Sequence, residues 1–208
     1  MSERDFRPLD AYADRLVLTE GWSDASAFDA VATDSEASAY QAVRYLLERG
    51  HRRIGYLAGE PRLHAYHLWG RGYRRALVDA GIDCTDLPVV HMRARTEEAR
   101  VDMLGWLSTD PAMPTAFLAD SDRIAVGAIR ALSERGLSVP QDVSVMGFDG
   151  LLSANFCTPP LTTVFVPKAE IGRFAVRKLT DALGGKREFF STTLVAASIA
   201  ARGSVRSL

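Results

Sequence analysis

From residue 34 onward, the hydrophobic pattern of this 208-residue chain alternates between the period of a helix and the period of a strand. Helical periodicity marks residues 34–50, 73–81, 96–107 and 122–136, and short apolar runs follow near 54–57, 87–92, 115–120 and 143–149. Neighbouring parallel strands need a crossover helix between them. Four such alternations therefore predict an α/β fold with a parallel sheet and right-handed crossovers.

Beyond residue 149 the pattern changes. An extended segment at 159–167 precedes a helix around 171–179, which Gly184 and Gly185 end, and the chain finishes with an extended stretch near 192–200. Residues 1–30 are less regular, although "RLVLTEG" is compatible with a strand. We therefore expect this part of the chain to be the remainder of a larger unit.

Composition excludes several classes of function. The chain carries 25 basic and 26 acidic residues, so it has no net field that would attract nucleic acid or an anionic membrane. We find no signal-peptide core and no apolar run near the roughly 18 residues of a membrane span, so we expect a cytoplasmic protein. Cys84 and Cys157 match no metal or redox spacing.

Ligands of open α/β sheets bind beyond the carboxyl ends of the strands. These ends are Gly59-Glu60, residues 91–95, residues 120–122 and residues 148–150. The glycines of "HLWGRGYRR" at 67–75 fit neither a phosphate loop nor a dinucleotide fingerprint, and its arginines lie off the apolar side of a helix beginning there. With no nucleophile elbow and no metal-ligand pattern, we predict no enzyme, cofactor or metal site. Asp34 or Ser35, Thr96 and Asp122 are expected to cap the helices that begin at these positions.

Several stretches resemble the effector-binding core of the LacI/GalR family of bacterial transcription regulators. They are "VATDSEASAYQAVRYLLERGHRRIGYLAG", "GYRRALVDAGI", "PTAFLADSDRIAVGAIRALSERGLSVPQDVSVMGFD", and "PPLTTV" followed by "IGRFAVRKL". They span about residues 31–180 in the family's order. The chain is therefore identified as a member of that family.

The resemblance implies a periplasmic-binding-protein type I fold, in which the effector lies between two α/β subdomains. Residues 51–163 and 191–208 would form a nearly complete C-terminal subdomain, and residues 1–50 and 167–190 a truncated N-terminal one. The family's helix-turn-helix, hinge helix and first strands would be missing, so this chain should not read an operator by itself. Exposed sheet edges should then lower its stability or favour an oligomer.

The resemblance also nominates ligand-binding residues. Trp69 stands where the family has an effector-binding Arg, Ser121 where it has an Asn, and Asp149 matches a retained Asp, although Gly150 replaces the next one. Each has an ordinary alternative: Trp69 can pack against a neighbouring loop, Ser121 can begin a helix, and Asp149 can stabilise its own turn. Loss of the Arg favours a neutral, sugar-like ligand.

The implied function is effector sensing by a non-catalytic domain, with a sugar or nucleoside-like small molecule as partner. A solute-binding receptor of the same fold, or a family member that has lost its ligand, are the alternatives. The family also implies a homodimer through the helices at 97–107 and 122–132 and the neighbourhood of Cys157. Met103 and Ile124 would lie in that interface or in the core.

Overall fold

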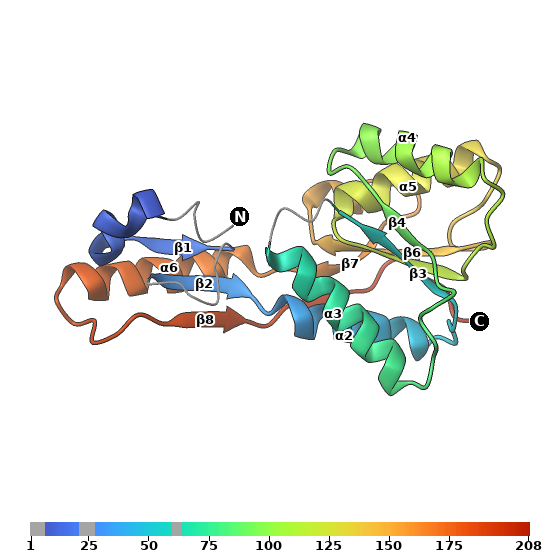
Figure 1. Cartoon of the computed structure of the whole chain (residues 1–208). Coiled ribbons are helices and arrows are strands. Elements are labelled where there is room, and N and C mark those ends of the chain that lie inside the picture. The colour runs from blue at the N-terminus through green and yellow to red at the C-terminus, as the bar shows by residue number, and fades with distance from the viewer. Residues whose placement is uncertain (1–6, 21–27, 60–63) are drawn as a thin grey trace.

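The computed structural model describes residues 7–20, 28–59 and 64–208, which form two β-sheets joined side by side (Figure 1). The larger sheet has six strands in the order β4-β3-β5-β6-β7-β9, and the smaller has three in the order β1-β2-β8. The predicted α/β class with parallel-sheet subdomains is confirmed.

The larger sheet contains the strands predicted from the alternating pattern. All neighbouring pairs are parallel except β7 and β9, which are antiparallel. Its strands are β3 (Ile54–Ala58), β4 (Val89–His91), β5 (Ala116–Ala119), β6 (Ser144–Asp149), β7 (Thr162–Phe165) and β9 (Ser198–Ala200).

Two pairs of helices cover the faces of this sheet. The helices are α2 (Ser35–Leu47) and α3 (His64–Asp79) in one pair, and α4 (Thr96–Leu107) and α5 (Asp122–Glu134) in the other. Successive strand residues point to opposite faces, so Tyr56 and Leu118 pack under α2 and α3, whereas Leu57 and Phe117 pack under α4 and α5. A short 3-10 helix, η2 (Leu152–Asn155), follows β6.

The first residues of the helices differ in part from the sequence-based expectations. Asp34 caps α2, as its side chain accepts a hydrogen bond from the Ala37 amide at 3.0 Å. Thr96 is not a cap: α4 begins at that residue, and Arg95 before it makes no capping bond. Asp122 is not the cap of α5 either, because Ser121 occupies that position and accepts from the Ile124 amide at 3.3 Å.

The whole of "HLWGRGYRR" lies inside α3, because this helix begins earlier than predicted, at His64. Gly72 lies against α2 so closely that a β-carbon there would overlap the Glu36 carbonyl. Arg71 and Arg75 both pair with the Glu36 carboxylate, at 3.1 and 2.7 Å. Both features join α3 to α2, which explains the stretch without a phosphate or a nucleic acid.

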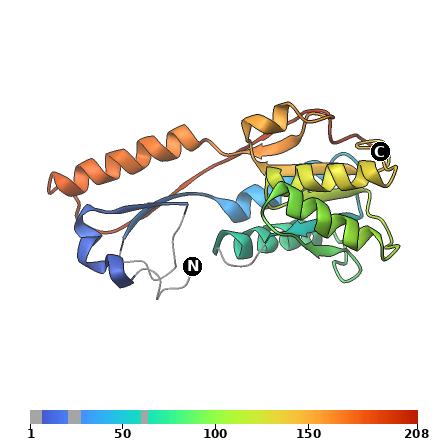
Figure 2. The same cartoon turned by 90° about the horizontal axis from the view of Figure 1, so that it is seen from above.

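The smaller sheet is all parallel and consists of β1 (Val17–Thr19), β2 (Asp29–Thr33) and β8 (Thr192–Val195). Helix α6 (Lys168–Leu183) runs along it, at the opposite end of the molecule from α4 and α5 (Figure 2). A 3-10 helix, η1 (Arg7–Arg15), packs near α6. The strand expected in "RLVLTEG" is therefore β1.

The two sheets divide the chain differently from the expected boundaries. Within residues 1–50, α2 packs on α3 and on the larger sheet, while β1 and β2 form the smaller sheet. Within residues 191–208, β8 joins the smaller sheet and β9 the larger. The final extended stretch thus serves both sheets, because its two strands are separated by only two residues, 196–197.

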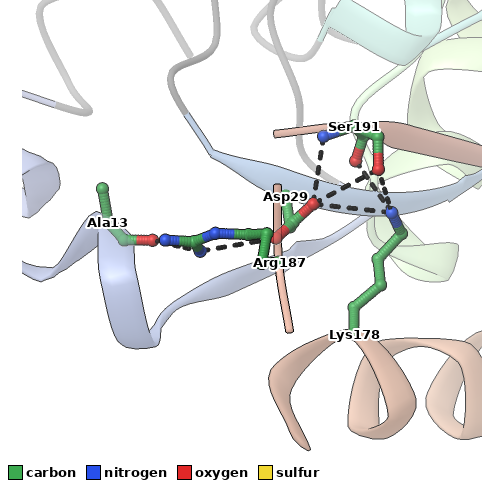
Figure 3. Close-up of polar contacts among 5 residues, drawn as sticks. All are labelled: Ala13, Asp29, Lys178, Arg187 and Ser191. Atoms are coloured by element: carbon green, nitrogen blue, oxygen red, sulfur yellow. Dashed lines mark hydrogen bonds and ion pairs between the residues drawn. The ribbon is translucent and has the colours of Figure 1, made fainter. Parts of the chain in front are cut away.

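Asp29 ties the smaller sheet to its surroundings (Figure 3). Its carboxylate is 2% exposed and accepts a hydrogen bond from the Ser191 amide at 3.0 Å. The Lys178 ammonium of α6 and the Arg187 guanidinium each lie 3.5 Å from one of its oxygens. Arg187 also donates to the Ala13 carbonyl of η1 at 3.0 Å, so one charged cluster connects four segments.

Core packing decides the role of two residues considered for a dimer interface. Met103 and Ile124 are both 0% exposed and belong to the cluster beneath α4 and α5. They therefore stabilise the fold and cannot contact a second protomer.

Cys84 and Cys157 are free cysteines.

Candidate functional site

A cavity of about 400 Å³ lies between the two sheets. The smaller sheet contributes Thr19 and Glu20 at the end of β1, and α6 contributes Lys168 and its neighbours. The larger sheet contributes residues at the carboxyl ends of β5 and β6, where parallel strands leave loops that converge. A volume of this size is typical of sites for small organic molecules.

The three residues nominated from the sequence, Trp69, Ser121 and Asp149, all line this cavity. They come from α3, from the turn after β5 and from the end of β6. Tertiary structure therefore brings together residues that are up to 80 positions apart in the sequence.

Trp69 forms an apolar wall. Its side chain is only 1% exposed and packs edge-on against Phe148, with an 83° angle between the rings. Both rings belong to the core that continues into the smaller sheet. Because the residue is almost fully buried, the indole borders the cavity with only a small part of its surface, and packing fixes the ring in place.

Ser121 and Asp122 have separate tasks. The Ser121 hydroxyl oxygen accepts from the backbone of α5, as described above, and the residue borders the cavity. Asp122 lies behind it: its carboxylate accepts from the Thr163 hydroxyl at 2.5 Å and from the Leu151 amide at 2.6 Å. Asp122 thus fixes the loop that follows β6 directly after Asp149, the last residue of that strand.

Asp149 has an unusual backbone conformation. Its φ angle is +115°, a region that side chains rarely adopt, and its carbonyl accepts a hydrogen bond from the Lys168 ammonium. Strained backbone of this kind is concentrated at functional sites. Burial, aided by repulsion from Asp122, raises the pKa of the Asp149 carboxyl to about 6, although Lys168 and Arg123 oppose the shift.

The cavity also contains polar residues that were not nominated from the sequence. Glu20 borders it and accepts hydrogen bonds from the Thr33 hydroxyl at 2.7 Å and amide at 3.2 Å. Asp120 and Lys168 border it as well. Asp120 was identified in the sequence as a residue at a strand end. No sequence pattern indicated that Glu20 or Lys168 would lie opposite β5.

The other strand ends do not contribute to this cavity. His91, at the end of β4, lines a separate space of about 150 Å³ together with His67 and Arg74. Gly59 borders that second space too, and Glu60 lies outside the described residues.

The cavity offers hydrogen-bonding side chains and apolar surface to a bound molecule. Among the described residues, no group of histidine, cysteine and acidic side chains is arranged to hold a metal ion. In the same ranges, none of the helices is long and apolar enough to span a membrane.

Comparison with known proteins gives a consistent result. Residues 43–205 match the model of the periplasmic binding protein-like domain. The chain is 35% identical over 193 residues to the transcriptional repressor CytR of Escherichia coli K12, covering 93% of this chain and 56% of that protein. It is 33% identical over 193 residues to the ribose operon repressor of Haemophilus influenzae, covering 93% of this chain and 58% of that protein.

Solved structures agree with the fold. The regulator CelR in complex with cellobiose superposes with a TM-score of 0.84 at 26% identity, over 98% of this chain and 71% of that chain. The chain spans little more than half the length of the curated relatives it matches.

Proposed function

The chain belongs to the periplasmic binding protein-like family, with LacI-family repressors among its relatives, and from this premise we propose that it is the effector-sensing part of a transcription regulator. Its ligand is a small sugar-like or nucleoside-like molecule without an anionic group. The protein acts as a regulator rather than an enzyme, in the cytoplasm.

One observation carries this proposal: the cavity of about 400 Å³ is lined by both sheets. A ligand in that position contacts the ends of β1 and α6 on one side and the ends of β5 and β6 on the other. Its binding energy can therefore favour one relative placement of the two sheets over another, which is what a sensor requires.

In the proposed complex, Trp69 contacts an apolar part of the ligand, and Asp149 and Ser121 form hydrogen bonds with its polar groups. Support comes from the position of all three residues on the cavity wall and from the positive φ angle of Asp149. Among the described residues that line the cavity, Glu20, Asp120 and Asp149 carry carboxylates and Lys168 is cationic. This balance disfavours an anionic ligand, and the cellobiose complex of CelR is consistent with a sugar.

The remaining parts of the proposal concern the whole protein. We propose a homodimer through the outer faces of α4 and α5 and the segment near Cys157. DNA would be bound by a helix-turn-helix domain outside the sequence described above. The smaller and larger sheets would be the cores of the two subdomains.

The test is isothermal titration calorimetry of the folded chain with a panel of neutral sugars and nucleosides, including ribose, cellobiose and adenosine. Asp149→Asn should weaken binding about tenfold, as expected for the loss of one hydrogen bond to a charged group. Glu48→Gln is a matched control, because Glu48 lies at the far end of α2 and is 60% exposed. Absence of heat with every compound, and with amine-bearing analogues of these compounds, from a chain shown to be folded, would refute the sensing function.

A further inference from the structure

Asp120 is a buried carboxylate in the wall of the cavity. It follows β5 and is 3% exposed. One carboxylate oxygen accepts a hydrogen bond from the Tyr56 hydroxyl, and the other accepts from the Gly59 amide at 2.6 Å. The side chain also borders the smaller space beside His91, so it separates two cavities.

The other buried carboxylates of the described chain have different surroundings. Asp29 has the cations Lys178 and Arg187 within 3.5 Å. Asp122 has two hydrogen-bond donors, and the positive charges of Arg202 and Lys168 act on it. Within residues 7–20, 28–59 and 64–208, no cation forms an ion pair with Asp120.

A buried carboxylate without a cation is costly, because removal from water is repaid only by strong partners. Accordingly, burial raises the pKa of Asp120 to about 7, against the effect of its two hydrogen bonds. Each carboxylate oxygen can accept about two hydrogen bonds, and each oxygen here receives one from the protein. Asp120 therefore has acceptor capacity left at the wall of a cavity.

The charges around the cavity favour a positive group on the ligand. Three carboxylates, those of Glu20, Asp120 and Asp149, border the space. The ammonium of Lys168 donates to the main-chain carbonyl of Asp149, so carboxylates outnumber cations among the described lining residues.

We infer that Asp120 is a specificity-determining residue of the cleft, and that it selects a ligand that carries a protonated amine. The inference rests on the proposed sensing function and narrows its ligand to sugar-like or nucleoside-like amines. The amine donates to the carboxylate oxygens of Asp120 and supplies a positive charge that the described residues around this carboxylate do not provide.

The experiment compares ligands that differ only by an amine in place of a hydroxyl. Suitable pairs are D-glucosamine with D-glucose, D-galactosamine with D-galactose, and 5′-amino-5′-deoxyadenosine with adenosine. Calorimetry with the whole chain should show at least one amine binding about tenfold or more tightly than its hydroxyl partner, the range expected for a hydrogen bond to a charged group. Asp120→Asn should reduce that ratio to about one, and Asp120→Ser serves if the first variant does not fold.

Tyr56→Phe separates recognition from a structural role, since it removes a hydrogen bond to Asp120 but keeps the carboxylate. This variant should retain the preference for the amine, even if it binds both ligands more weakly. Equal binding within every pair, or an amine preference unchanged in the Asp120 variants, would overturn the inference and leave the sensing function standing. Failure of all six compounds and of the neutral panel to bind would overturn the sensing function, and the inference with it.

Discussion

Replacing Asp29 with Asn should destabilise the smaller sheet. The substitution keeps the size of the side chain and the acceptor for the Ser191 amide, but it removes the negative charge that faces Lys178 and Arg187. Both cations are shielded from water, with side chains 17% and 19% exposed. Their charges would then be partly buried without a counter-charge.

The size of the effect follows from what the two cations retain. Breaking a fully buried ion pair costs about 3–5 kcal/mol. Lys178 keeps the Ser191 hydroxyl at 2.6 Å and carbonyl at 3.1 Å, and Arg187 keeps the Ala13 carbonyl at 3.0 Å. We therefore expect a loss below that range, about 2 kcal/mol.

Hydrogen exchange measured by mass spectrometry would detect the change where it arises. Amides of β2 and β8 should exchange about 30-fold faster in Asp29→Asn, whereas those of β3 and β5 should change less, because one face of the larger sheet has a separate core under α4 and α5. Glu48→Gln, which removes an exposed ion pair with Arg44, should alter stability by less than about 0.5 kcal/mol. Unchanged exchange in β2 and β8 would refute the stabilising role of the cluster.

Two further predictions concern packing and pH. Gly72→Ala should lower the free energy of unfolding, measured in urea, by about 1–3 kcal/mol, because the new methyl group overlaps the α2 backbone. Gly105→Ala is the control: its site is open, so the substitution should be neutral or stabilising. Equal effects of the two substitutions would contradict the close packing at Gly72. The pKa of Asp120 is about 7 in the folded chain and 3.8 for the free side chain. Between these two pH values the folded chain holds a proton that the unfolded chain has lost, so stability should fall as the pH rises from about 4 to 7. Other titrating groups are common to wild type and Asp120→Asn, so their contributions cancel when the two proteins are compared. The drop in melting temperature from pH 5 to pH 7.5 should therefore be larger in wild type than in Asp120→Asn. An equal drop in both proteins would show that Asp120 does not titrate in this range.

Much of the fold could be predicted because each element carries its own periodicity. The strands and helices between residues 34 and 149 were identifiable from apolar spacing, as were α6 and the strand β1. Helix starts were less predictable: Thr96 and Asp122 have capping side chains, yet Arg95 and Ser121 occupy the positions before the helices. Which polar residue becomes the cap depends on where the preceding strand ends, and local sequence does not determine that.

The sequence by itself determined the α/β class and the family, and it nominated Trp69, Ser121 and Asp149 as candidate ligand-binding residues. Tertiary structure decided that α2 belongs with the larger sheet, that the last 18 residues serve both sheets, and that Met103 and Ile124 are core residues. It also placed Glu20 and Lys168 opposite Asp120 across one cavity. The physical reason is that periodicity reports which side of an element is buried, whereas the partner that buries it, and the charges gathered around a buried carboxylate, depend on contacts between distant segments.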